Sequence, residues 1–213
     1  MTPEDWTAVG LSLRVALVAT AVAAGPSIAL GWALARRQGW WTGVVELAVL
    51  LPLVLPPVVT GYVLLLVLPR GITFTWVASV AASAVVGVPL FVQLARVGFE
   101  AVSPSVVEAA RVDGASRWDV ARRVVVPLAA PALAAGATLH FARALGEFGA
   151  TLVVAGNLPG RTQTLPLALY SRLQQIGGEA ASIRLAVAAV VLAAVSLGAS
   201  RLLAGRWARR IAP

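Results

Sequence analysis

The chain has 213 residues, of which 59% are hydrophobic and only 12% are charged, and its mean hydropathy is +0.87. A water-soluble domain usually carries about 25% charged residues, so this composition excludes an ordinary soluble globule and indicates a membrane protein. Cysteine is absent, which excludes disulfides, thiol catalysis and cysteine-based metal sites.

Five segments are long and apolar enough to cross a bilayer, which takes about 20 residues of helix. They are residues 11–35, 44–68, 73–97, 128–150 and 183–204. A sixth stretch, 164–174, is short and polar and predicts a surface or re-entrant helix. No linker or repeat divides the chain, so we expect one all-α membrane domain over residues 1–213.

All 17 basic residues are arginines, and the chain has only 9 acidic residues. A basic excess also fits nucleic-acid binding, but these arginines lie between apolar runs and predict no nucleic-acid partner. They fit positive-inside topology better. The larger group includes the arginines of residues 103–127 and of the C-terminus, which we expect in the cytoplasm, with the acidic N-terminus outside. The smaller group is Arg14, Arg70, Arg161, Arg172 and Arg184.

Prolines interrupt the second predicted span at Pro56 and Pro57, in "LPLVLPPVVTGY". A proline leaves a helix carbonyl unpaired, which is tolerated where the backbone is buried in protein or lines a wet cavity. This segment is therefore a candidate lining of a transport path, with the hydroxyls of Thr60 and Tyr62 available to a passing anion. An ordinary kinked helix whose hydroxyls bond neighbouring helices is the alternative.

Arg143 and Glu147 lie one turn apart in the fourth predicted span. A lone charge there costs at least about 2.5–3.5 kcal/mol on insertion scales, and pairing at this spacing lowers the cost. The pair is either a structural contact or a gate and electrostatic guide for a dianion. The single histidine, His140, predicts a packed polar residue, and no metal site is expected.

The most polar stretch of the middle of the chain, residues 103–127, predicts two short helices around Gly114. Gly114 stands where a left-handed residue ends a helix. Ser116 begins the next helix with Asp119 as a capping-box acid, and Asp119 precedes Arg123 in the favourable order for an ion pair.

The spacing of this stretch resembles the EAA motif in the membrane subunits of bacterial ABC importers. The matching residues are Glu108, Ala109, Ala110, Gly114, Val124, Val126 and Pro127. The valines stand where isoleucine and leucine are usual. The resemblance implies that residues 103–127 form a cytoplasmic coupling loop that docks on a separate ATPase, with Glu108 anchoring its helix and Gly114 permitting the turn.

Two further stretches, "LPLVLPPVVTGY" and "RALGEFGATLVVAGNLPGRTQTLPLALY", resemble the permease subunit of molybdate transporters. Sulfate permeases share something like "RALGEFGA", and tungstate is not separable from molybdate. The loop "GNLPGRTQT" is expected outside the cell. Its Arg161, Thr162 and Thr164 either meet the oxyanion or its binding protein, or belong to a loop folded over the pore mouth.

Together these resemblances imply a type I ABC importer permease in a bacterial or archaeal cytoplasmic membrane. The implied partners are a second copy, two ATPase subunits holding Mg-ATP, an extracytoplasmic oxyanion-binding protein and membrane lipid. Without lysine the chain has no P-loop, so we expect no catalytic residue and no cofactor in it. The alternatives are a permease for sulfate or another oxyanion, and an ATP-independent secondary transporter. Secondary transporters usually show paired interrupted helices, whereas the sequence shows one clearly proline-broken span.

Overall fold

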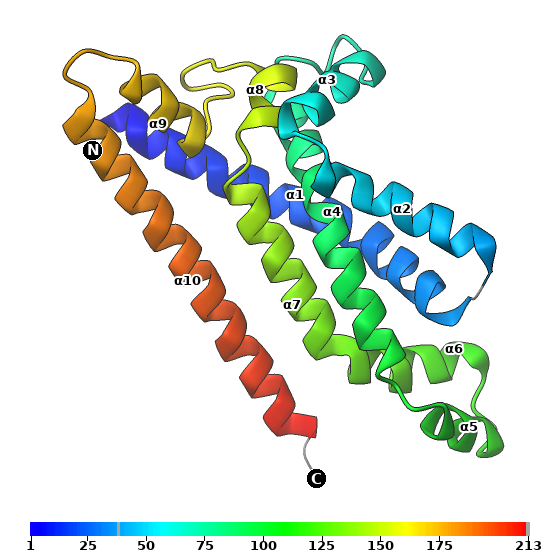
Figure 1. Ribbon diagram of the computed structural model, residues 1–213. Helices are drawn as coiled ribbons and strands as arrows, with labels where there is room; N and C mark the ends of the chain where they lie inside the picture. The colour runs from blue at the N-terminus through cyan, green and yellow to red at the C-terminus, as the bar shows by residue number, and fades with distance from the viewer. Residues whose placement is uncertain (38, 212–213) are drawn as a thin grey trace.

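The computed structural model describes residues 1–37 and 39–211, and the side chains in these ranges as far as residue 199. Every regular element in this part of the chain is a helix (Figure 1). The long helices are α1 (Pro3–Arg36), α4 (Trp76–Glu100), α7 (Val126–Leu145) and α10 (Glu179–Ile211). The shorter ones are α2 (Trp40–Val54), α3 (Pro57–Val67), α5 (Pro104–Val112), α6 (Arg117–Val120), α8 (Gly149–Ala155) and α9 (Leu165–Leu173). A π-helical turn, η1 (Ala121–Val125), joins α6 to α7.

The predicted spans 11–35, 73–97 and 183–204 correspond to α1, α4 and α10, each long and apolar enough to cross a membrane. The second span, 44–68, is two helices, α2 and α3, with a bend of 113° at the break between them. The fourth differs from the prediction, because its helix begins at Arg117 and stops at Leu145 rather than continuing to residue 150. The described residues then hold up to five spans when the bent pair is counted as one, as predicted.

Small residues allow α1, α4 and α7 to approach closely at the centre of the molecule. A Cβ atom on Gly31 of α1 would lie 2.6 Å from the Cβ of Ala95, and one on Gly98 of α4 would lie 2.6 Å from the Cβ of Ala132. Lipid tails are as apolar as leucine, so membrane helices associate largely through such close packing. The three helices therefore form the rigid frame that carries the remaining elements.

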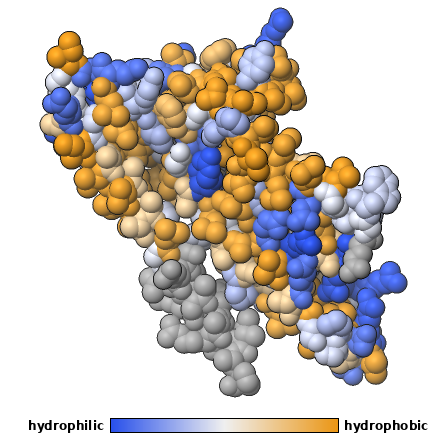
Figure 2. Space-filling view, viewed as in Figure 1, coloured by the Kyte–Doolittle hydropathy of each residue, from blue (hydrophilic) through white to orange (hydrophobic). Residues whose placement is uncertain are grey.

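The N-terminus, α3, α8 and α9 lie at one end of this frame, and α5, α6 and the last turns of α10 lie at the other (Figure 1). Helix α9 is held against α1, because Ser12 Oγ accepts a hydrogen bond of 2.6 Å from the backbone N–H of Leu165. With nine residues, α9 covers about 14 Å and is too short to cross a membrane. Apolar residues cover most of the visible face, and hydrophilic ones gather over α5 and α6 (Figure 2).

Candidate functional site

The polar loop between α4 and α7 is anchored in the helical frame by three valines. Val107, Val120 and Val125 are buried in one cluster with Phe91 and Phe99 of α4. Burying each valine side chain contributes about 1.5–3 kcal/mol relative to leaving it exposed. The loop is therefore a packed extension of α4 and α7. Sequence reasoning missed these valines. Val107 lies one helical turn before Ala110, so the two share one apolar face of α5, and this spacing could have indicated a buried contact.

Gly114 ends α5 as predicted. Its φ is +86°, and its N–H donates to the carbonyl of Arg111 at 3.0 Å while the N–H of Ala115 donates to the carbonyl of Ala110 at 3.1 Å. These two bonds form a Schellman motif, which needs a left-handed residue at this position. The motif sets the direction in which the chain leaves α5.

Ser116 caps α6, and its Oγ accepts a hydrogen bond of 3.1 Å from the backbone N–H of Asp119. The capping box is incomplete, because the Asp119 carboxylate accepts from the Ser116 hydroxyl and not from its backbone N–H. Asp119 does pair with Arg123, at 3.4 Å between Oδ1 and Nε. Both side chains are largely exposed, so this pair adds little stability.

The residues of the EAA pattern divide into two sets. Glu108, Ala109 and Gly114 are exposed, whereas Ala110 packs against the valine cluster. The Glu108 carboxylate forms no ion pair with any side chain that the structure describes. The remaining members, Val124, Val126 and Pro127, lie where η1 passes into α7. The exposed residues are thus available to another chain, while the partly buried Ala110 packs against the frame.

At the opposite end of the frame, two interrupted helices meet. One break separates α2 from α3 at Leu55 and Pro56, and the other separates α7 from α8 at residues 146–148. A Cβ on Gly149 would lie 3.1 Å from the Cβ of Pro57, and a Cβ on Gly61 would lie 2.7 Å from the carbonyl oxygen of Ala150. Among the described residues one span is broken at prolines, as predicted. The break between α7 and α8 contains no proline and was not expected.

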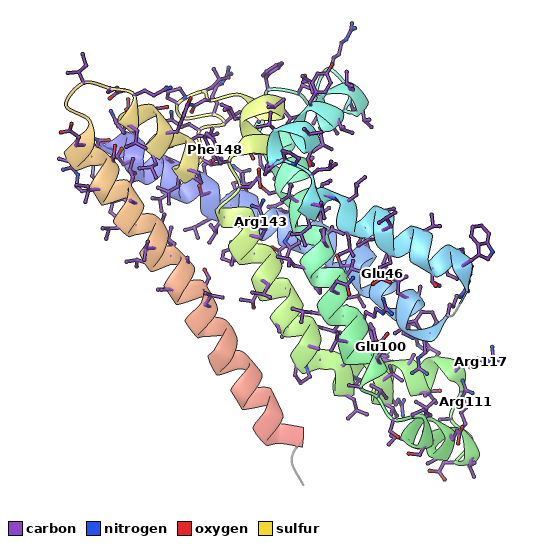
Figure 3. The ribbon with its side chains drawn as sticks, in the orientation of Figure 1. Glu46, Glu100, Arg111, Arg117, Arg143 and Phe148 are labelled. Atoms are coloured by element: carbon purple, nitrogen blue, oxygen red, sulfur yellow. The ribbon has the colours of Figure 1, made fainter. Side chains whose placement is uncertain are left out.

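Arg143 and Glu147 form the predicted ion pair, with 2.8 Å between Nη1 and Oε2. Figure 3 shows Arg143 near the end of α7. Glu147 does not lie on the helix as expected, because α7 ends at Leu145. Its side chain is 1% exposed, and its Oε1 accepts a hydrogen bond of 2.9 Å from the N–H of Ala150 in the first turn of α8. Arg143 is 28% exposed. Glu147 thus joins the end of α7 to the start of α8.

The predicted path hydroxyls do not face the same way. Thr60 is buried, and its Oγ1 has no hydrogen-bond partner among the described residues. Tyr62 is exposed, as are Pro56 and Pro57. Next to the two breaks, Thr60 of α3 and Thr151 in the first turn of α8 both combine burial with a hydroxyl that has no partner among the described residues.

The loop "GNLPGRTQT" between α8 and α9 folds on itself. Thr162 and Thr164 are buried, and Thr162 Oγ1 accepts a hydrogen bond of 3.1 Å from the N–H of Leu158. Asn157 donates to Ser171 of α9 at 2.8 Å. Contact with the oxyanion or its binding protein was one of two expectations for Arg161, Thr162 and Thr164, and only Arg161 is exposed.

Sequence reasoning also missed an ionic cluster between α2 and α4. Arg96 pairs with Glu46 at 2.8 Å and with Glu100 at 2.7 Å, and Gln93 donates to Glu46 at 3.3 Å. Glu46 and Glu100 are seen on the two helices in Figure 3. Gln93, Arg96 and Glu100 share one face of α4. This spacing of polar residues in an apolar helix could have indicated the cluster from the sequence. In the described part of the chain, no three acidic or histidine side chains are close enough to hold a metal ion.

Residues 27–209 match the family described as "binding-protein-dependent transport system inner membrane component". The chain is 39% identical to the molybdenum transport system permease protein ModB of Escherichia coli (strain K12), over 99% of this chain and 96% of the relative. It is 38% identical to ModB of Haemophilus influenzae, over 96% of each chain. It is also 32% identical to the sulfate transport system permease protein CysT of Escherichia coli (strain K12), over 98% of this chain and 80% of the relative.

Solved structures show the same fold. A chain of the MetNI methionine ABC transporter superposes with a TM-score of 0.72 at 15% identity, covering 97% of this chain and 99% of that chain. A chain of a bacterial ABC transporter that imports alginate gives 0.68 at 16% identity, covering 100% of this chain and 82% of that chain. The architecture of interrupted helices around a packed frame is thus that of ABC importer permeases.

Proposed function

Because the chain belongs to the family of binding-protein-dependent transport system inner membrane components, we propose that it translocates molybdate or tungstate inward as the membrane-spanning subunit of an ATP-driven importer. The similarity to molybdenum permeases over nearly the whole chain carries this proposal. A sulfate permease is the second candidate, favoured by the 32% identity to CysT.

The proposed partners follow from the loop at residues 103–127. Two such chains form a homodimer around the path, and each loop docks on one ATPase subunit that binds Mg-ATP. The exposed Glu108 and Ala109 face the ATPase. The chain has no lysine with which to build a P-loop of its own, and ATP hydrolysis belongs to the partner.

The valine cluster supports a mechanism for coupling. A displacement of the loop by the closing ATPase is transmitted to α4 and α7, because Val107, Val120 and Val125 pack directly on those helices. Helix α7 ends at the second break, beside α3. Movement at the loop therefore reaches the interrupted helices at the opposite end, and alternates the openings of the path.

The candidate path and gate lie at those breaks. Pro56 and Pro57 interrupt one helix, Glu147 and Arg143 join the pieces of the other, and the Thr60 hydroxyl between them is free of protein partners in the described structure. The positive charge of Arg143 attracts a dianion. The paired Glu147 carboxylate partly neutralises that charge and so weakens the binding of the dianion, which favours its release. At the outer surface, Arg161 is the member of its loop available to the binding protein.

The multi-pass helices and the family place the chain in the inner membrane. We propose that the end with α5, α6 and the C-terminus is cytoplasmic and that the N-terminus is outside. Helices α5 and α6 lie at the proposed inner end (Figure 1). They and the adjoining η1 carry four arginines, in keeping with the positive-inside rule.

The test is reconstitution of the chain in proteoliposomes with its ATPase and binding protein. Uptake is measured with molybdate, tungstate and sulfate in turn, for the wild type and for Glu108→Ala. We expect molybdate- and tungstate-dependent uptake that Glu108→Ala reduces, together with weaker ATPase assembly. The matched control is Glu179→Ala, which removes an exposed acid from the first turn of α10 at the other end.

Sulfate-dependent uptake without a response to molybdate would transfer the proposal to the second candidate. A chain that transports without any ATPase would contradict the proposed mechanism as a whole.

A further inference from the structure

A cavity of ≈ 800 Å³ lies between the second half of α1 and the loop formed by α5, α6 and η1. Gly25, Ile28, Ala29 and Trp32 form its wall on α1. A Cβ added to Gly25 would have no atom within 4 Å, so this wall is open along the helix. The cavity lies at the loop end of the frame, away from the interrupted helices and the proposed path.

The cavity combines apolar walls with three arginines. Val107 and Val125 line it from the loop side, together with the exposed Arg36, Arg111 and Arg117. These arginines come from α1, α5 and α6, and Arg111 and Arg117 lie at the same end of the molecule (Figure 3).

Among the residues that the structure describes, no acid lines the cavity, and none of the three arginines forms a salt bridge. Three unpaired positive charges at one cavity favour the binding of a negatively charged molecule. Its apolar walls call for a hydrocarbon chain on the same molecule.

The dimensions match one leaflet of a membrane. From Gly25 to Arg36 is about 16 Å of helix, and half of the hydrocarbon core is about 15 Å thick. Trp32 and Trp118 line the cavity and are 46% and 72% exposed, and tryptophan is enriched where hydrocarbon meets headgroups. The arginines therefore lie at headgroup level, and Gly25 lies toward the bilayer centre.

We propose that this cavity binds one anionic glycerophospholipid from the leaflet on the side of the loop. The phosphate contacts Arg36, Arg111 and Arg117, and an acyl chain lies along Gly25 and Ala29. The lipid joins α1 to the polar loop, so the anionic lipid content of the membrane acts on the position of that loop. The inference needs only the membrane location of the chain and is independent of which anion it carries.

The experiment is lipid titration of the purified full-length chain, followed by native mass spectrometry. Phosphatidylglycerol and phosphatidylcholine with identical acyl chains are the probes, and glycerol 3-phosphate is the soluble anion. The variant Arg111→Gln/Arg117→Gln is compared with Arg122→Gln/Arg123→Gln, which removes two charges from the same loop outside the cavity. Each arginine near an anionic surface contributes about fivefold to binding, so we expect the first variant to bind phosphatidylglycerol roughly 30-fold more weakly and the second to change much less.

Gly25→Leu provides an independent test, because it fills the acyl groove in open space and leaves the charges unchanged. We expect it to weaken phosphatidylglycerol binding while the melting temperature stays the same. Equal binding of the two lipids, equal losses in the two double variants, or glycerol 3-phosphate binding as tightly as phosphatidylglycerol would each overturn the proposal. Loss of the bound lipid when the ATPase assembles with the chain would also overturn it, since protein then fills the cavity.

Discussion

His140 joins three helices at the centre of the molecule. It is fully buried on α7, with Nδ1 3.0 Å from Thr20 Oγ1 of α1 and Nε2 3.2 Å from the carbonyl oxygen of Ala84 in α4. The carbonyl can only accept, so Nε2 carries a proton. The ring lies against Gly87, where a Cβ would come within 2.6 Å of it. His140 is thus a packed polar residue, as predicted.

Gly87→Ala should destabilise the protein, because the hydrogen-bonded imidazole cannot move away from the added methyl group. Overpacking of this kind costs about 1–3 kcal/mol, which should lower the melting temperature in detergent by several degrees. Gly10→Ala is the control, since a Cβ at that position of α1 meets nothing within 4 Å. Equal melting temperatures for the two variants would show that the ring has room to shift.

Arg143 and Glu147 should show a measurable coupling energy. Glu147→Gln keeps the shape of the side chain but leaves the partly buried Arg143 without its partner, whereas Arg143→Gln leaves a buried carboxylate unpaired. Removing one partner of a buried pair costs 3–5 kcal/mol in the fully buried limit, so we expect about 1–3 kcal/mol for this half-open pair. Thermal unfolding of the two single variants and the double variant measures the interaction. Strict additivity would mean that the pair is not coupled.

At the scale of elements, helix ends carry the functional geometry. Helix α5 ends in the Schellman motif at Gly114, and α8 begins where Glu147 accepts from the N–H of Ala150. Both ends lie beside segments that we assign to coupling or to the path. A few backbone hydrogen bonds set the direction in which the chain leaves α5 and enters α8. Single substitutions at these two helix ends should therefore reduce activity even where they change the side-chain volume only slightly.

Substitutions at Gly114 should follow backbone preference and not side-chain volume. Its φ of +86° is open to glycine and tolerated by asparagine, but costs other residues about 1–2 kcal/mol. Substrate-stimulated ATP hydrolysis by the assembled transporter should therefore decrease in the order glycine, asparagine, alanine, valine. If alanine retained more activity than asparagine, space and not conformation would be the constraint at this turn.

At the scale of the whole molecule, the frame of α1, α4 and α7 separates two polar ends. One end carries the exposed residues of α5 and α6, and the other carries the loop between α8 and α9 (Figure 1). Helix α2 has no buried residue and is tied to α4 by the pair between Glu46 and Arg96. This arrangement leaves large apolar faces for lipid and for a second copy of the chain.

Single cysteines should report which end faces the cytoplasm, because the chain contains no cysteine of its own. In intact cells, a membrane-impermeant thiol reagent should label Leu158→Cys, which replaces an exposed residue at the proposed outer end. Ser105→Cys, exposed on α5, should be labelled only after the membrane is opened. The reverse pattern would invert the proposed topology.

The sequence by itself determined the class of protein, the approximate spans and the two short helices around Gly114. Those properties depend on composition and on residues close together in the chain, such as the spacing from Glu108 to Gly114 and Pro127. Only the tertiary structure decided that α7 stops at Leu145, that the two breaks meet at Pro57 and Gly149, and that Thr162 is buried. Gly146, Glu147 and Gly149 mark the second break in the sequence, but the apolar runs on both sides are long enough that average hydropathy continues the span across it. These features arise from contacts between distant segments, where close packing and the satisfaction of buried polar groups outweigh local preference.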